Sequence, residues 1–172
     1  NWVATYTISG SNRVSIAVTP TDTNYVYALS SNSSNNGFKG LYRSTNGGQN
    51  FTLRSSTPNI LGWTPTGTGI DTSGQGWYDL TIVADPSNVN TIYVGAINTW
   101  KSTNGGSTWT LKSHWAGATG VQTVHADKHV LEFRGTNLWE GNDGGVYKSA
   151  NGGNTWVNKT NGIVHSQMYR LG

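Results

Sequence analysis

The sequence predicts an all-β fold assembled from repeated four-stranded units. Its composition favours strands and turns, because 23 of the 172 residues are Gly and only 11% are charged, fewer than helical surfaces carry. Aromatic residues make up 11% of the chain, and together with Val and Ile they suit pleated sheets. Cysteine is absent, so the core must depend on burial and turn chemistry rather than on disulfides.

A stretch that reads as strand, turn and strand occurs three times, at 40–53, 98–111 and 145–158. Each copy centres on Ser-x-Asn-Gly-Gly between two aromatic residues, a hairpin pattern in which Gly can adopt positive φ. The Ser hydroxyl and the Asn side-chain oxygen can both accept hydrogen bonds from the turn amides. The structural turn residues that we predict are Ser44, Asn46, Gly48, Ser102, Asn104, Gly106, Trp109, Ser149, Asn151, Gly153 and Trp156.

Another strand pair precedes each hairpin, which gives four strands per unit. The pairs are 14–18 with 25–29, 80–84 with 91–95, and 130–133 with 137–140. The hairpin serines are 47 residues apart from Ser102 to Ser149, within the ~40–50-residue period of propeller blades, and 58 apart from Ser44 to Ser102, where we expect an insertion. We therefore predict a β-propeller segment of about three four-stranded antiparallel blades, approximately at 14–55, 79–113 and 129–160.

Three blades cannot close a ring, since propellers usually need about four to eight. An open arc would also expose unpaired strands and apolar blade faces, which favour aggregation. We therefore expect residues 1–172 to be a partial propeller within a longer polypeptide, with 161–172 beginning a further blade. We therefore expect the segment to pack against the remaining blades of the same polypeptide, which would be its partners in the closed ring.

The hairpins resemble the Asp-box, or BNR, repeat of sialidases, sortilin-type receptors and xyloglucanase-type glycoside hydrolases. The family pattern is Ser-x-Asp-x-Gly-x-Thr-Trp, and the copy at 102–109 departs from it only in Asn104. All three copies carry Asn at this position, and the first also has Asn50 and Phe51 in place of Thr and Trp. The resemblance implies that these are structural turns far from any active site.

The strings at 76–86, 125–129 and 141–149 resemble large exported propellers of Bacteroidetes-type bacteria, which a type IX secretion system often carries. This resemblance implies an extracellular or cell-surface location. No apolar run approaches the ~20 residues that span a bilayer. We predict no membrane span and no cofactor.

Two long connections, 54–79 and 112–129, lead into the innermost strands of the second and third blades. In a propeller such connections lie on the face opposite the repeated turns, where ligands usually bind. Both are rich in aromatic and titratable residues. The ligand-binding residues that we predict there and on the adjacent turn are Trp63, Trp77, Tyr78, Trp115, His125, His129 and Asp143.

These residues support three interpretations. Tryptophans could stack on a glycan while Asp79 and Asp127 act as acid and base, which requires carboxyls ~5–9.5 Å apart. His125, Asp127 and His129 alternate along an extended strand and could hold zinc or a similar ion, although bracing of the loop by hydrogen bonds is the commoner role. The third interpretation is recognition of a polysaccharide or a protein without any reaction.

Charge argues against two classes of function. The 11 Lys and Arg residues give a net charge of +3 but are dispersed, so we predict no nucleic-acid binding. Sialidases bind a carboxylate through several arginines, and no arginine here neighbours Asp79 or Asp127 in sequence. We predict an exported or cell-surface propeller segment for recognition and scaffolding, with a xyloglucanase-like or sialidase-like hydrolase as the alternative.

Overall fold

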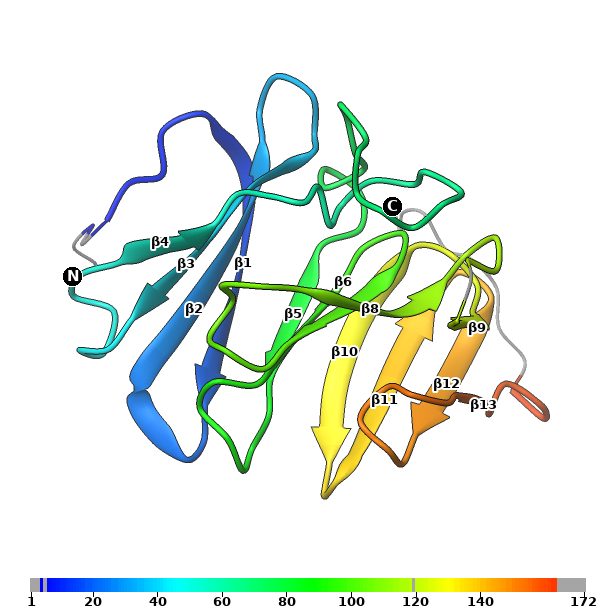
Figure 1. Cartoon of the computed structure of the whole chain (residues 1–172). Coiled ribbons are helices and arrows are strands. Elements are labelled where there is room, and N and C mark those ends of the chain that lie inside the picture. Colours follow the sequence, from blue (N-terminus) through cyan, green and yellow to red (C-terminus); the bar gives the residue numbers. More distant parts are fainter. Residues whose placement is uncertain (1–3, 5, 119, 164–172) are drawn as a thin grey trace, which may run out of the picture.

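Three β-sheets lie one beside the next in the computed structural model, which describes residues 4, 6–118 and 120–163 (Figure 1). The first sheet contains β1 (Ser11–Thr19), β2 (Asp22–Asn32), β3 (Phe38–Ser44) and β4 (Thr52–Ser55). The second contains β5 (Thr81–Ala84), β6 (Ile92–Gly95), β7 (Thr99–Ser102), β8 (Thr110–His114) and β9 (Gln122–Thr123). The third contains β10 (Lys128–Arg134), β11 (Asn137–Asn142), β12 (Gly145–Ser149) and β13 (Val157–Asn158).

Within each sheet the strands follow chain order, and consecutive strands are antiparallel except for β8 and β9. The first strands of the three sheets, β1, β5 and β10, contact one another in that order. This is the arrangement of successive propeller blades around an axis, as the sequence predicted. The short parallel strand β9 was not predicted, because its two exposed residues carry no hydrophobic alternation.

Apolar side chains fill the spaces between neighbouring sheets. Leu41 of the first sheet belongs to one core cluster with Val94 and Trp100 of the second, and Tyr93 belongs to another with Leu138 of the third. The strands therefore bury one row of side chains against each neighbouring sheet. The opposite row of β1, Val14, Ile16 and Val18, remains exposed.

The repeated turns satisfy their own backbone groups, as the sequence predicted. In the second sheet, Ser102 Oγ accepts a hydrogen bond from the Gly106 amide at 2.9 Å and donates one to Asn104 Oδ1 at 3.0 Å. Asn104 Oδ1 also accepts the Thr108 amide at 2.9 Å. The serines and asparagines of the other two turns make equivalent bonds, so asparagine is sufficient to close this turn.

The turn of the second sheet also binds the outer strand of the first. Arg54 donates to the Gly105 carbonyl at 2.9 Å, Ser55 Oγ donates to the Gly106 carbonyl at 2.6 Å, and Trp109 Nε1 donates to Ser55 Oγ at 2.9 Å. Gly106 itself lies against Leu41, so that a side chain there would overlap Leu41 Cδ2. The repeated turns of the second and third sheets are thus contacts between sheets as well as connections within one.

Gly106→Ala is expected to destabilise the chain by about 1–3 kcal/mol more than Gly48→Ala, because only the first substitution overpacks a contact between sheets. The two glycines occupy the same place in their turns, at φ 83° and 84°, so backbone strain is shared. Around Gly48 the nearest atom to an added methyl is 3.9 Å away. Urea unfolding of both variants measures the difference, and equal losses would show that the contact with Leu41 is dispensable.

The long connections 56–80 and 115–127 lie at the end of the sheets away from the repeated turns, and we call this end the top face (Figure 1). The β11–β12 turn lies there too. Among the described residues no helix is long and apolar enough to cross a membrane. Most of the further blade predicted at 161–172 lies outside the described residues, and 161–163 form no strand.

Candidate functional site

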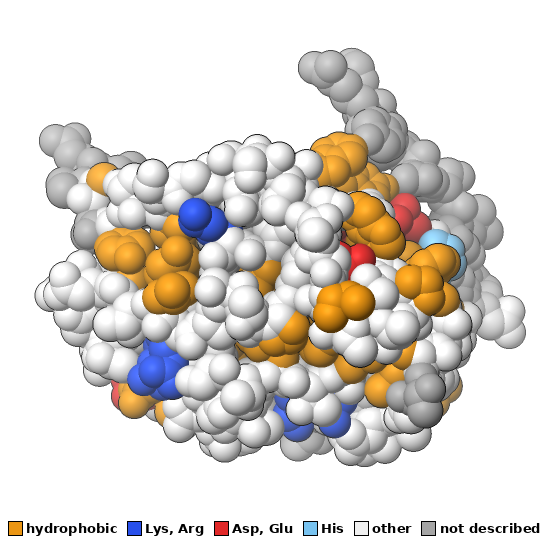
Figure 2. Space-filling view, turned by 45° about the horizontal axis from the view of Figure 1, so that its top comes forward, with side chains coloured by type: hydrophobic (Ala, Val, Ile, Leu, Met, Phe, Trp, Pro, Cys, Tyr) orange, Lys and Arg blue, Asp and Glu red, His pale blue; other side chains and the backbone are white. Residues whose placement is uncertain are grey.

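A hollow of about 540 Å³ opens on the top face, and three tryptophans from the long connections line it with Asp127. Trp63, Trp77 and Trp115 expose 40%, 56% and 41% of their surface. Figure 2 looks toward this end of the molecule and shows apolar groups with acidic side chains and a histidine among them. The structure therefore brings together the three loop tryptophans that the sequence singled out.

Hydrogen bonds between loops hold this hollow in shape. Trp115 Nε1 donates to the Trp63 carbonyl at 2.9 Å, and the Trp115 amide donates to Asn98 Oδ1 at 3.0 Å. Asn98 in turn donates from Nδ2 to the Gly62 carbonyl at 3.3 Å. Because the three segments bind one another, the walls are formed before any ligand arrives.

His114 supports the same wall from below. Its ring is completely buried, its Nδ1 accepts the Ala116 amide at 3.0 Å, and its Nε2 lies 3.1 Å from the Thr64 carbonyl. Since Nδ1 accepts, Nε2 carries the hydrogen and donates to Thr64. The histidine is therefore a brace between the two long connections.

Asp79 and Asp127 lie side by side at the edge of the hollow. Asp79 is completely buried, and its side chain is close enough to Asp127 to hydrogen-bond with it. Both carboxyl oxygens of Asp79 and Oδ1 of Asp127 are buried and receive no hydrogen bond from any other group in the described part of the chain.

The pKa of Asp79 rises to about 8, mainly because burial disfavours its charged form and secondly because the negative charge of Asp127 is adjacent. Asp79 is consequently protonated at neutral pH and can donate its hydrogen to Asp127. This is the arrangement of a carboxyl pair that shares one proton. Convergence of these two carboxyls is a condition of the hydrolase interpretation, and the two side chains do lie together. A catalytic role for them stays a prediction.

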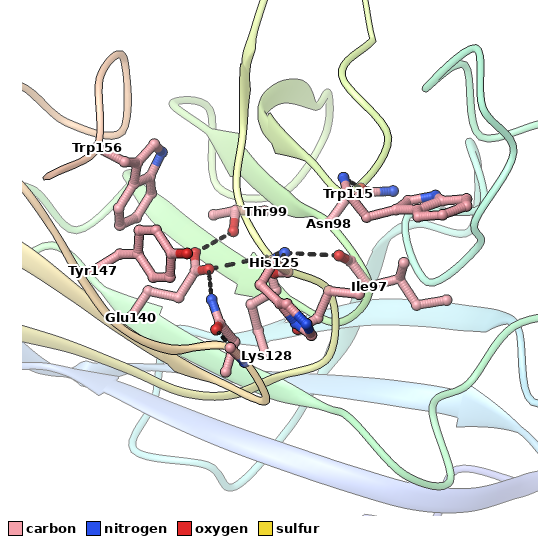
Figure 3. Close-up of polar contacts among 12 residues, drawn as sticks. Ile97, Asn98, Thr99, Trp115, His125, Lys128, Glu140, Tyr147 and Trp156 are labelled. Carbon is pink, nitrogen blue, oxygen red and sulfur yellow. Dashed lines mark hydrogen bonds and ion pairs between the residues drawn. The ribbon is translucent and has the colours of Figure 1, made fainter. Parts of the chain in front are cut away.

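Lys128 and Glu140 form a second buried group (Figure 3). Lys128 Nζ donates to the carbonyls of Ile97 at 2.7 Å and His125 at 2.6 Å, and lies 3.8 Å from Glu140 Oε1. Thr99 Oγ1 donates to Glu140 Oε2 at 2.5 Å. The lysine thereby joins the second sheet, the third sheet and the connection that carries Asp127.

Both members of this pair have no exposed surface. Burial lowers the pKa of Lys128 and raises the pKa of Glu140, while the attraction between their charges opposes both shifts. Sequence inspection missed both residues. Charged side chains on strands normally face solvent, and only the apolar residues around them hint at burial.

Tyr78, His129 and Asp143 form a separate polar cluster rather than a wall of the hollow. Tyr78 donates from its hydroxyl to Asp143 Oδ2 at 3.1 Å, and His129 Nε2 lies 2.8 Å from Asp143 Oδ1. The tyrosine and imidazole rings meet edge to face with centroids 4.9 Å apart. Six of the seven predicted ligand-binding residues thus divide between the apolar hollow and this neighbouring cluster, and His125 belongs to neither.

The predicted metal ligands do not come together. Asp127 has φ 62°, which breaks the extended backbone that would have placed His125, Asp127 and His129 on one side of a strand. Asp127 turns to Asp79, His129 bonds Asp143, and His125 Nδ1 lies 3.2 Å from the Ala126 carbonyl. Within 4, 6–118 and 120–163 no group of three or more His, Asp or Glu side chains could hold a metal ion.

Arginines in the described residues do not form a carboxylate-binding set at the hollow. Arg13 reaches the top face, where its guanidinium donates to the carbonyls of Trp77 at 3.1 Å and Tyr78 at 2.6 Å. Arg54 binds the repeated turn of the second sheet, and Arg134 pairs with Glu132 at 3.1 Å. This geometry does not favour a sialidase-like site.

Comparison with known proteins supports the fold. No protein-family model matches the chain, and no curated protein matches it. Among solved structures, a GH74 enzyme from Niastella koreensis superposes with a TM-score of 0.57 at 24% identity, over 86% of this chain and 22% of that chain. YCF48 from Cyanidioschyzon merolae superposes with a TM-score of 0.54 at 13% identity, over 88% of this chain and 38% of that chain.

A structure of YCF48 bound to D1 peptide is also similar, with a TM-score of 0.53 at 12% identity, over 86% of this chain and 40% of that chain. The chain therefore spans about a fifth to two fifths of the length of these proteins. At such identities the likeness shows the fold alone, an all-β propeller segment.

Proposed function

We propose that this propeller segment recognises a glycan in the tryptophan hollow. The observation that carries the proposal is the convergence of Trp63, Trp77 and Trp115, each partly exposed, on one hollow beside a carboxylate. Flat aromatic faces suit the apolar faces of sugar rings, and a few polar groups at the edge of an apolar pocket fix the orientation of a ligand.

The bonds that brace the hollow favour this role. Trp115 is fixed through both its indole and its amide nitrogen, so little side-chain freedom is lost when a ligand binds. Asp127 lines the hollow and offers an acceptor for sugar hydroxyls. A preformed site of this kind supports binding without any movement of the loops.

Hydrolysis is a weaker candidate for the same site. A protonated Asp79 has the pKa of a general acid, but its carboxyl has no exposed surface and lies within hydrogen-bond reach of Asp127. Glycosidases need their two carboxyls ~5–9.5 Å apart with the substrate between them. We therefore propose recognition rather than catalysis for this segment.

The wider setting belongs to the same proposal. The Ser-x-Asn-Gly-Gly turns make the bonds expected of Asp-box turns in which Asn replaces Asp, and those of the second and third sheets join neighbouring sheets rather than lining the hollow. We propose that they are diverged Asp-boxes in an exported or cell-surface protein. Recognition would then take place outside the cell, where polysaccharides are abundant ligands.

Trp77→Ala is expected to weaken glycan binding at least about tenfold, because an exposed indole face contributes roughly 1.5–3 kcal/mol when a ligand covers it. Trp77 is the most exposed of the three tryptophans, at 56%, so its removal should leave folding intact. Titration calorimetry with xyloglucan, cellulose and chitin oligosaccharides provides the measurement. Ile70→Ala is the control, since Ile70 is 73% exposed on the same connection and does not line the hollow. Equal loss in both variants, or no binding of any oligosaccharide to the wild type, would refute the proposal.

A further inference from the structure

The acidic pair beside the hollow lacks hydrogen-bond donors. Within the described residues, both oxygens of Asp79 and Oδ1 of Asp127 are buried and receive no hydrogen bond from a Lys, Arg or His side chain. Asp79 is sealed off, whereas Asp127 also lines the hollow. A ligand in the hollow therefore meets Asp127, which forms no ion pair with a Lys, Arg or His side chain of the described residues.

Neighbouring cations are engaged elsewhere. The positive charge of Lys128 attracts Asp79 and Asp127, but it attracts Glu140 more strongly. The Nζ atom of Lys128 also donates hydrogen bonds to two backbone carbonyls. Arg13 uses its guanidinium on the carbonyls of Trp77 and Tyr78. His125 contacts the Ala126 carbonyl through Nδ1. With Lys128 balanced by Glu140, the charge of Asp127 is left for the ligand to neutralise.

The walls of the hollow favour the same kind of ligand group. Indole faces attract cations more strongly than other aromatic rings do, and three tryptophans line the hollow together with Asp127. The protein as a whole has a net charge of +3, so a cationic ligand is not drawn to it by overall charge. Attraction of a cation to this site would have to be local.

We infer that the glycan bound in the hollow carries a protonated amine, as an amino sugar does, and that this amine faces the Asp127 carboxylate between the tryptophan rings. This inference rests on the proposed glycan recognition and names its ligand class. The sugar ring stacks on indole, while the ammonium group donates hydrogen bonds to Asp127 and makes cation–π contacts with the walls.

The test compares two ligands that differ only at the amino group, which is charged in glucosamine oligomers and acetylated in N-acetylglucosamine oligomers of the same length. Titration calorimetry at about pH 6 is expected to show at least about tenfold tighter binding of the amine form, in line with a charge-assisted hydrogen bond. Added salt should weaken the preference, because it screens the charge pair.

Asp127→Asn should abolish the preference, so that the amine and acetylated oligomers bind the variant with similar affinity. Asparagine tolerates the left-handed backbone at φ 62°, so the variant keeps the loop conformation. Asp22→Asn makes the same chemical change in the β1–β2 turn, away from the top face, and should retain the full preference. Thermal unfolding of both variants confirms that they are folded.

The outcomes separate this inference from the proposal that it rests on. Equal binding of the two oligomers, with both weakened by Trp77→Ala, would overturn the amine inference and leave glycan recognition standing. Binding of a lysine-rich peptide without binding of any oligosaccharide would overturn both. A tenfold preference that survives Asp127→Asn would also overturn the inference, because the carboxylate would then not be the partner.

Discussion

Asp79→Asn is expected to remove most of the fall in stability that the wild-type chain shows between about pH 5 and about pH 8. Burial and then the charge of Asp127 raise the pKa of Asp79 from 3.8 to about 8. In this window the folded chain holds a proton that the unfolded chain has released. The free energy of unfolding therefore falls as pH rises, by up to ~1.4 kcal/mol per pH unit and roughly 4 kcal/mol across the window.

Asparagine has the shape of the protonated carboxyl, and its amide can donate to Asp127 at every pH. The variant should therefore gain stability relative to the wild type as pH rises toward 8. Urea unfolding at intervals of one pH unit measures the difference in the free energy of unfolding between the variant and the wild type. The titration of Lys128 and Glu140 contributes to both proteins and therefore largely cancels in this difference. Two parallel curves would show that Asp79 is not protonated in the folded state.

Asp127→Asn provides the companion measurement. Removing the adjacent negative charge should lower the pKa of Asp79, while burial continues to hold it above its ordinary value. The fall in stability should then end at a lower pH than in the wild type. An unchanged end point would mean that burial alone sets the protonation of Asp79.

The sequence was sufficient to predict the fold because the repeated turns are defined by local chemistry. One turn is closed by hydrogen bonds of Ser102, Asn104 and Gly106 to groups no more than four residues away in sequence. The same residue types recur in the turns of the other two sheets. The spacing of these turns then predicted three sheets. The amino-acid sequence did not indicate that Gly106 packs against Leu41 of the neighbouring sheet.

The site could be predicted only in part. Trp63, Trp77 and Trp115 were recognisable because they lie in long connections, where apolar side chains are not required by a strand. The alternation argument failed at Asp127, because it assumes extended backbone and the residue has φ 62°. A single positive φ therefore turned an expected row of ligands into three separate contacts.

Lys128 and Glu140 were missed for a different reason. Glu140 lies on a strand that alternates in the ordinary way, whereas Lys128 lies at a register shift of β10. A charged residue on a strand is generally expected to face water. Their partners, the Ile97 carbonyl and Thr99, are 31 and 41 residues away in sequence. Burial of this pair depends on the packing of the third sheet against the second, which a local pattern does not report.

Lys128→Met is expected to destabilise the chain by about 3–5 kcal/mol at neutral pH, because it leaves the Glu140 carboxylate buried without its cation. The substitution also deprives the carbonyls of Ile97 and His125 of their donor. Methionine is unbranched and of similar length, so little of the loss should come from a cavity. Urea unfolding measures the effect, and Lys159→Met, at an exposed position, should change stability by less than about 0.5 kcal/mol.

A second substitution separates the charge effect from the lost hydrogen bonds. In the Lys128→Met background, Glu140→Gln removes the buried charge while keeping an acceptor for Thr99, so it should restore stability that the single variant lost. The same change in the wild type strands the lysine charge instead and should destabilise it. If Glu140→Gln is equally harmful in both backgrounds, the pair is not coupled, and Lys128 acts only as a donor to the loops that shape the hollow.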